Sequence, residues 1–460
     1  MRSEDRWAME EFSSIDFGDK RLKERLIKLA EKLSDSPESS INEACEDWAG
    51  AKAAYRFFQN EKISESPILA SHIKQTVERM RGSEIVLAIQ DKSFFNYTSH
   101  PCTEGLGKIT SHLSTSQKKV PVHGLVMHTC FAVGTDGIPL GLLDQRIYAR
   151  KPVTAKKSEL KNIPIEKKES FGWLQSLRGS LLATQQTKTK IVTVCDREAD
   201  IYEFFELAER MDSPVLVRAF HDRKLDKRNS QARLWDHMAH LRSEGTLQVN
   251  VPAKTSRPAR IATLEIRFGK VTLPKKTVSS EKVLTLNVVY VKEIRPPSKD
   301  QALEWMLLTQ IPVNTISEAM EKVRWYCLRW RIEMFHKVLK SGLQVESCRL
   351  AKAERLRRYL TLMSIIAWRI FWTAFVSRST PEERCTTILH DHEWKVLYCK
   401  IHHTKTIPKI TPSVYEAVRW IARLGGFLAR KHDGEPGMVT LWRGWKKLFY
   451  LAEGWELATK

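Results

Sequence analysis

The chain has 460 residues, and 42% of them are hydrophobic, so it is long enough for about two to four domains with real cores. Lys and Arg outnumber Asp and Glu by 75 to 54, which gives a formal net charge of +21. This composition excludes an intrinsically disordered chain and favours a folded protein that binds a polyanion such as nucleic acid.

The first 80 residues show three short helical patterns. Apolar residues recur on one face over Asp19–Leu33, and Lys and Arg crowd the other positions. A second helix is predicted over Glu43–Asn60, and Pro67 opens a third. The inward side of the second helix is expected to hold Trp48, Ala51, Tyr55 and Phe58. Short helices with a basic face are typical of a DNA-binding domain, here over residues 1–80, although an ordinary helical subdomain fits equally well.

Two apolar runs each end in an acidic residue. Residues 85–91 read Ile-Val-Leu-Ala-Ile-Gln-Asp, and residues 190–196 read Lys-Ile-Val-Thr-Val-Cys-Asp. A continuous apolar run of this length predicts a buried strand, which presents its last carboxylate at the edge of the sheet. A hairpin over residues 122–148 and a helix over residues 171–184 are predicted between them. We expect residues 81–212 to form the first part of an α/β core.

The composition changes over residues 213–300. This segment holds 18 Lys and Arg against 8 Asp and Glu, which is +10 of the chain's +21. Apart from a first strand over Val215–Ala219, helical periodicity is weak and polar and apolar residues alternate, so we interpret the segment as a mainly antiparallel β insertion with a basic face. The core is expected to resume over residues 301–378, and a helical C-terminal region over residues 379–460.

The helix predicted after the strand Glu304–Thr309 carries an unusual set of side chains. Successive members are 3, 4, 4 and 3 residues apart, which places all of them on one face of an α-helix. They are Tyr326, Arg329, Glu333, Lys337 and Lys340. A carboxylate that can hold a hard metal ion beside cations that can hold phosphates suits phosphodiester chemistry. A solvated face with ion pairs explains this segment alone equally well.

Three acids, Asp91 and Asp196 at strand ends and Glu333 on a helix, reproduce the layout of the RNase H-like nucleotidyl-transfer fold. In that layout carboxylates converge on two divalent ions roughly 3.5–4 Å apart. Each acid also has a local alternative, because Asp91 can cap a turn and Asp196 can cap a helix, with Glu198 and Asp200 as competing ligands. Together, on a strongly basic chain, they favour a nuclease-like metal site.

With these residues identified, the chain resembles the bacterial DDE transposases of the insertion-sequence-4 family, especially the branch of the transposon-5 transposase. The family signature runs Tyr, two residues, Arg, three residues, Glu, six residues, Lys. The chain meets it with Tyr326, Arg329, Glu333 and Lys340. Similar blocks lie along nearly the whole chain, at residues 16–22, 53–58, 87–91, 194–201 and 420–430.

The resemblance implies an α/β fold with an RNase H-like catalytic core, interrupted by the β insertion and flanked by helical N-terminal and C-terminal domains. It implies cut-and-paste transposition through a DNA hairpin, with Asp91, Asp196 and Glu333 as catalytic ligands of two Mg²⁺ ions, for which Mn²⁺ can substitute. The expected partners are double-stranded DNA at transposon inverted repeats, target DNA and a second copy of the chain. The resemblance further implies a cytoplasmic, nucleoid-associated protein without a membrane span.

The resemblance also implies which residues contact DNA. Tyr326, Arg329 and Lys340 would contact phosphates, and Trp305 would stack against an extruded base, although Trp305 can equally be plain core. Lys337 and Arg218 complete the candidate DNA-contacting set.

One residue departs from the family, because Lys92 follows the first Asp where small hydroxyl residues are usual. If the strand continues, Lys92 points away from the metals, and if not, its ammonium opposes Mg²⁺ binding. A host nuclease on the same fold and a catalytically silent DNA-binding relic remain the alternatives.

Eight cysteines are scattered along the chain without a C-x-x-C pair, which leaves zinc and redox motifs unsupported and fits reduced cytosolic thiols. The most apolar run, residues 360–376, contains Arg369 and is expected to be a buried helix.

Overall fold

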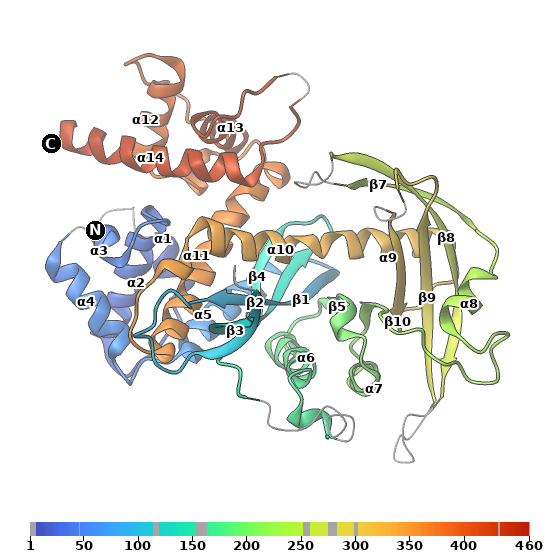
Figure 1. The fold of residues 1–460 in the computed structure, drawn as a ribbon. Helices are drawn as coiled ribbons and strands as arrows, with labels where there is room; N and C mark the ends of the chain where they lie inside the picture. Colours follow the sequence, from blue (N-terminus) through green and yellow to red (C-terminus); the bar gives the residue numbers. More distant parts are fainter. Residues whose placement is uncertain are drawn as a thin grey trace.

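The structure is a computed structural model that describes residues 6–45, 47–113, 119–152, 163–251, 258–274, 283–298, 302–430 and 433–459. A large mixed sheet runs through the molecule, with helices on both faces and helical domains at one end (Figure 1). The strands are β1 (Ile85–Asn96), β2 (Gly107–Leu113), β3 (Lys119–Gly134), β4 (Pro139–Tyr148), β5 (Lys190–Cys195), β6 (Val215–Arg218), β7 (Gly245–Val251), β8 (Arg260–Leu273), β9 (Leu284–Glu293) and β10 (Glu304–Thr309). The longer helices are α1 (Arg6–Glu11), α2 (Lys20–Asp35), α3 (Ile41–Cys45), α4 (Trp48–Gln59), α5 (Glu65–Arg79), α6 (Phe171–Thr184), α7 (Tyr202–Arg210), α8 (Leu234–Ala239), α9 (Ile316–Leu328), α10 (Trp330–Lys337), α11 (Ala353–Ser379), α12 (Asp391–His402), α13 (Val414–Leu424) and α14 (Met438–Thr459).

The sheet has the strand order β2-β3-β1-β5-β6-β10-β9-β8-β7, and β4 pairs with β3. Strands β1, β5 and β6 are parallel, and the strands on either side of them run antiparallel. Buried parallel strands are covered on both faces, which explains the unbroken apolar runs of β1 and β5. The α/β fold class with helical N- and C-terminal regions is confirmed.

The β segment expected over residues 213–300 is joined to the rest of the sheet. β7, β8 and β9 form an antiparallel meander, and β9 pairs with β10, so the same sheet continues from the core into this meander (Figure 1). β6 also lies in the expected range, yet it pairs with β5 and β10 in the middle of the sheet. The register of these pairs therefore fixes the meander rigidly beside the core strands.

Helices cover the two faces of the central strands differently. Side chains of α9, α10 and α11 share one apolar cluster with Leu87, Ile89, Val192 and Val194. The opposite face packs against α6 and α7, which lie together on that side in Figure 1. Within the described residues α11 is the one helix apolar and long enough to cross a membrane, but 83% of that stretch is buried inside the protein. This agrees with the buried helix expected from the sequence.

The N-terminal helices confirm one expectation and correct another. α2 begins as predicted, with the Asp19 side chain accepting a hydrogen bond from the Arg21 N–H. The helix expected over Glu43–Asn60 is instead broken into α3 and α4, because Asp47 caps a new helix through the Gly50 N–H. Trp48, which we expected inside, is the first residue of α4 and is 75% exposed, whereas Phe58 is buried as expected.

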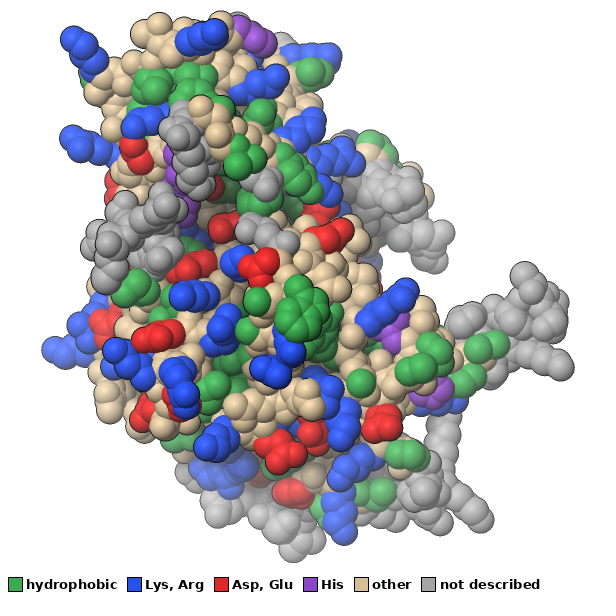
Figure 2. All heavy atoms as spheres, turned by 90° about the vertical axis from the view of Figure 1, so that its left-hand side faces the viewer, with side chains coloured by type: hydrophobic (Ala, Val, Ile, Leu, Met, Phe, Trp, Pro, Cys, Tyr) green, Lys and Arg blue, Asp and Glu red, His purple; other side chains and the backbone are tan. Residues whose placement is uncertain are grey.

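Tyr55 is likewise exposed, whereas the neighbouring Ala54, Phe57 and Phe58 are buried. Figure 2 views the molecule from the side of these N-terminal helices and shows Lys and Arg side chains spread over this face between acidic and hydrophobic ones. An aromatic and basic surface is thus presented to solvent, where the sequence pattern indicated core.

The C-terminal region is helical as expected and packs tightly. A Cβ at Gly444 would lie 1.8 Å from the Ile421 carbonyl oxygen, and one at Gly425 would lie 1.7 Å from the Thr440 carbonyl oxygen. These two glycines therefore allow the backbones of α13 and α14 to touch.

Candidate active site

The first two acids lie on neighbouring strands. β1 and β5 pair in parallel with Gln90 opposite Cys195, so Asp91 and Asp196 come next in the two chains. Asp196 directly follows β5 as expected, but β1 continues to Asn96, so the expectation that Asp91 ends its strand is wrong. Successive side chains alternate between faces, and Gln90 and Cys195 are buried on the face of α6. The two carboxylates therefore face the opposite side, where α9 and α10 lie.

The carboxylate of Glu333 on α10 completes the group. Burial, together with the charges of Asp196 and Glu333, raises the pKa of Asp91 to about 7, although Arg329 opposes this rise. The three acids are therefore near enough to disfavour one another's ionisation. Carboxylate oxygens in this arrangement are the ligands that Mg²⁺ prefers, so the donor set fits a hard divalent cation.

The three carboxylates are nevertheless not yet gathered into a formed metal site. Among the residues that the structure describes, no three His, Cys, Asp or Glu side chains are arranged to hold an ion. Glu333 instead accepts a hydrogen bond from Arg329, with Nη2 and Oε1 2.5 Å apart. Asp196 accepts the Glu198 N–H at 2.8 Å, so the helix-capping alternative is also realised, on the short helix Arg197–Ala199. A metal ion that binds Glu333 or Asp196 must therefore compete with these hydrogen bonds.

Arg329 is the buried cation of this group. Its side chain is surrounded by Tyr326, Glu333 and Asp91, whose charges raise its pKa although burial alone would lower it. Within the part of the chain that the structure describes, its Nε has no hydrogen-bond partner. A buried guanidinium with an unused N–H is suited to receive an additional oxygen ligand, such as that of a phosphate.

A second layer of side chains supports Tyr326. Burial raises the pKa of Tyr326, while the nearby Arg329 and Arg218 lower it. Arg218, at the end of β6, hydrogen-bonds to the Tyr326 side chain and to the Glu304 carbonyl oxygen. The Trp305 ring meets the Tyr326 ring edge-on at 5.2 Å and is 8% exposed. Trp305 therefore lies at the site, with its ring covered by protein.

The helix of the signature is interrupted at two points, so the single regular helix expected from the sequence is wrong in detail. α9 ends at Leu328, α10 begins at Trp330, and a π-helix over Val338–Gly342 follows α10. Lys340 lies in this π-helix with its ammonium 5.3 Å from the centre of the Phe95 ring. Burial lowers the pKa of Lys340, whereas Glu346 and Asp91 act in the opposite direction, so Lys340 lies near the acids. Lys337 is exposed at the end of α10.

Lys92 points away from the three acids, which is the first of the two possibilities that the sequence left open. β1 continues to Asn96, so Lys92 lies on the face opposite Asp91, and its ammonium is 5.4 Å from the centre of the Trp173 ring. The departure from the family pattern therefore leaves the face of the three acids free of this ammonium.

Sequence reasoning missed His336, three residues after Glu333. Its Nδ1 lies 4.0 Å from Asp91 Oδ2, and its Nε2 lies 3.4 Å from Thr129 Oγ1. Burial, together with Lys340, lowers the pKa of His336 to about 3. The ring is neutral at physiological pH and adds no charge beside Asp91. The position of His336 three residues after Glu333 could have indicated that it lies near the site. Its approach to Asp91 depends on the fold and could not be read from the sequence.

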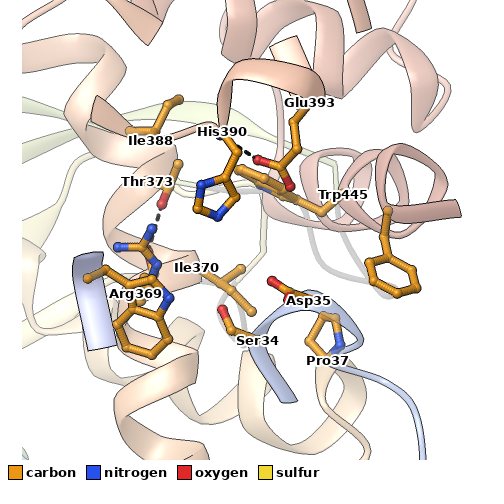
Figure 3. A pocket seen from close by; sticks show the side chains of 12 residues that line it. Ser34, Asp35, Pro37, Arg369, Ile370, Thr373, Ile388, His390, Glu393 and Trp445 are labelled. Carbon is orange, nitrogen blue, oxygen red and sulfur yellow. Dashed lines mark hydrogen bonds between the residues drawn. The ribbon is translucent and has the colours of Figure 1, made fainter. Parts of the chain in front are cut away.

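A separate cavity lies where the N-terminal helices, α11 and the C-terminal helices meet (Figure 3). Arg369 of α11 points into it, with Asp35 at the end of α2 and His390 and Glu393 at the start of α12 around it. Burial lowers the pKa of Arg369 to about 10, although Glu393 and other acids oppose this. None of the three candidate ligands lines this cavity, so it is a junction between domains rather than part of the candidate site.

Three family models match the chain in succession. Transposase DNA-binding matches residues 4–63, Transposase DDE domain matches residues 167–369, and Transposase Tn5 dimerisation domain matches residues 365–460. The DDE match contains Asp196 and Glu333, and β1 with Asp91 lies before its start.

Proposed function

Since the chain belongs to the Tn5-like DDE transposases, we propose that it cuts and rejoins DNA at the inverted-repeat ends of its own transposon through a hairpin intermediate. The observation that supports this proposal is that Asp91 and Asp196 lie on neighbouring parallel strands, with Glu333 near enough to affect the pKa of Asp91, beside the buried Arg329. The order of domains supports a DNA-binding and dimer-forming enzyme. Such a protein acts on the nucleoid in the cytoplasm.

The three carboxylates would hold two divalent ions, Mg²⁺ or Mn²⁺. The chemistry that ions supply at such a site is activation of the attacking water or 3′-hydroxyl and stabilisation of the departing 3′-oxygen. The parallel register of β1 and β5 supports Asp91 and Asp196 as neighbouring ligands. Glu333 must first exchange its hydrogen bond with Arg329 for an ion.

A phosphate of the DNA end can drive this exchange. Arg329 has an unused Nε, and a phosphate accepts two parallel N–H bonds from a guanidinium. When Arg329 turns to the phosphate, Glu333 loses its partner and is free to complete the ligand set. Binding of DNA and assembly of the metal site are thus coupled through one side chain.

The remaining candidate residues have distinct roles in this proposal. Tyr326 and Lys340 hold phosphates next to the cleaved bond, and Arg218 positions the phenol. Trp305 stacks an extruded base once its contact with Tyr326 opens. Lys337, which is exposed, reaches a phosphate further along the strand.

The exposed face of α4 is the proposed reader of the transposon end. The Lys52 ammonium lies 4.2 Å from the centre of the exposed Trp48 ring, and Tyr55 and Arg56 line the same surface hollow. Aromatic rings and cations together are suited to contact bases and phosphates. A second copy of the chain, joined through the C-terminal domain, brings the partner end and the target DNA together.

The proposal is tested by substituting the ligand that the helix supplies. Purified protein is incubated with Mg²⁺ and a duplex of the inverted repeat that flanks its own gene, and nicked, hairpinned and joined strands are separated on a denaturing gel. We expect hairpinned ends with the wild type, none in chelator, and none with Glu333→Gln, because one ligand is lost. The gel shift of Glu333→Gln should persist, since Glu333 does not contact phosphate.

Glu354→Gln, an exposed glutamate at the start of α11, serves as the matched control and should cleave normally. Strand cleavage that continues in the presence of a chelator would exclude the metal-dependent mechanism. Binding without any cleavage by the wild type would instead favour a silent DNA-binding protein.

A further inference from the structure

Phe220 is the exposed aromatic residue next to the candidate site. Phe220 is 58% exposed, whereas Trp305 is 8% exposed. Arg218 on β6 pairs with Leu307 on β10, and the Ala219 N–H then donates to the Met306 carbonyl oxygen at 2.7 Å. Phe220 is the next residue of the chain, just beyond this contact between β6 and β10. Because β5 and β6 are parallel, this end of β6 is also the edge that carries Asp196.

The backbone that presents Phe220 is firmly anchored. The N–H groups of Phe220 and His221 donate to Asp200 Oδ2 at 2.8 and 2.9 Å. Asp200 is 4% exposed, and Arg223 Nε donates to its other oxygen at 3.0 Å. Arg223 Nη2 donates to the same oxygen at 2.5 Å, so this buried carboxylate has four N–H donors and holds the segment in one conformation. An exposed phenyl ring on such a segment is a rigid surface, which loses little entropy when a flat group stacks on it.

The charges around the ring favour a nucleotide. The Arg197 guanidinium lies 5.6 Å from the centre of the Phe220 ring, and Arg197 directly follows Asp196 and is exposed. The His221 ring meets the phenyl ring edge-on at 5.0 Å. Single-stranded nucleic acid is commonly held by an aromatic face for the base and cations for the backbone. A purely apolar partner would not need the arginine.

We propose that Phe220 is the stacking surface for an unpaired base of the transposon-end strand beside the cleaved phosphate, with Arg197 holding the phosphate that adjoins this base. The inference rests on the proposed function. It adds a residue to the site, because the Trp305 ring is covered by Tyr326 while the Phe220 ring is open.

The test uses photocrosslinking, which reports stacking directly. Thymines near the end of the inverted-repeat duplex are replaced one at a time by 5-iodouracil, the complex is irradiated in chelator, and the crosslinked peptide is identified by mass spectrometry. We expect one position to crosslink to Phe220, to lose the crosslink with Phe220→Leu and to regain it with Phe220→Tyr. With Mg²⁺, Phe220→Leu should slow hairpin formation about tenfold and leave the first nick nearly unchanged.

Phe94→Leu is the matched control. Phe94 is also an exposed phenylalanine with an arginine over its ring, Arg150 at 5.1 Å, but it lies on the face of β1 away from Asp91. Crosslinks that map to Trp305 alone, or a Phe220→Leu protein that slows both steps equally, would overturn the inference while cleavage by the wild type still supports the proposed function. If the wild type neither binds nor cleaves the duplex, both the inference and the proposed function are wrong.

Discussion

Lys340 shows how a single side chain can be tested apart from the metal ligands. It lies in the π-helix after α10, partly buried, with its ammonium over the Phe95 ring. If it holds a phosphate, Lys340→Ala should weaken the end complex and reduce the slope of log K against log salt concentration by about 0.9, because one counterion fewer is released. Gel shifts over a salt series measure this. Lys190→Ala, at the opposite end of β5, should leave the slope unchanged, and an unchanged slope for Lys340→Ala would remove that residue from the DNA interface.

Glu11 is a buried acid that links the N-terminal domain to the core. It accepts hydrogen bonds from His72 Nδ1 at 2.5 Å and from Arg79 at 2.9 and 3.1 Å. The Leu142 N–H donates to His72 Nε2, and burial lowers the pKa of His72, so the neutral ring donates through Nδ1. Burial alone would raise the pKa of Glu11, but the hydrogen bond from His72 and the charge and hydrogen bonds of Arg79 hold it low, at about 2.

This depressed pKa predicts how stability depends on pH. The carboxylate stabilises the fold fully above its unfolded pKa of about 4.5 and loses that contribution as the pH falls toward about 2. The loss is about 3 kcal/mol in the free energy of unfolding, since each pKa unit corresponds to about 1.4 kcal/mol. Urea unfolding followed by tryptophan fluorescence should show that Glu11→Gln is destabilised at neutral pH and has a flatter acid profile. Glu24→Gln, at an exposed helix position, should match the wild type, and a steep acid profile in Glu11→Gln would contradict the assignment.

At the scale of elements, α4 exposes aromatic and basic side chains where the sequence pattern predicted core. Asp47 caps α4, and the helix then buries Ala54, Phe57 and Phe58 and exposes Trp48. If this face contacts the transposon end, Trp48→Ala should weaken end binding about five- to tenfold, in line with the loss of a stacked aromatic. Thermal unfolding should be unchanged within about 0.5 kcal/mol, because the side chain is exposed.

Leu182 on α6 provides the control for this face, since it is also a large exposed apolar residue but lies on a different element. Leu182→Ala should bind ends as the wild type does. Equal weakening by both substitutions would show a general surface effect, and normal binding by Trp48→Ala would exclude this face of α4 from the interface.

At the scale of the whole molecule, the C-terminal domain packs directly against the helix of the signature. A Cβ at Gly342, the last residue of the π-helix with Lys340, would lie 1.8 Å from the Trp442 ring of α14. The cavity around Arg369 lies at the junction of the same domains (Figure 3). The dimerisation domain and the site therefore share a contact, and a shift of α14 reaches the residue proposed to hold a phosphate.

Gly342→Ala tests this contact. The added methyl must push Trp442 aside, which should lower the free energy of unfolding by about 1–3 kcal/mol, as overpacking commonly does. Cleavage should fall more than binding of the N-terminal domain to the end, because Gly342 lies in the same π-helix as Lys340. Gly437→Ala, where an added Cβ meets nothing within 4 Å, should change neither quantity. Equal free energies of unfolding for the two variants would mean that Trp442 of α14 does not pack against Gly342.

The sequence by itself determined the acids, the signature and the α/β plan, because these depend on local residue order. Asp91 and Asp196 end apolar runs, and both runs became central strands. Helix-capping by Asp19 was also predictable, since a cap acts within one turn. The break before Trp48 and the interruption of the signature helix were not, because helical spacing alone does not fix where a helix restarts.

Only the tertiary structure decided which side chains meet. The pairing of Arg329 with Glu333, the approach of His336 to Asp91 and the contact of Arg197 with the Phe220 ring depend on strand register and on how α9 and α10 lie on the sheet. Register is set by packing between segments more than a hundred residues apart in sequence, such as β1 and β5. Residue order names the chemical groups, but long-range packing brings their atoms together.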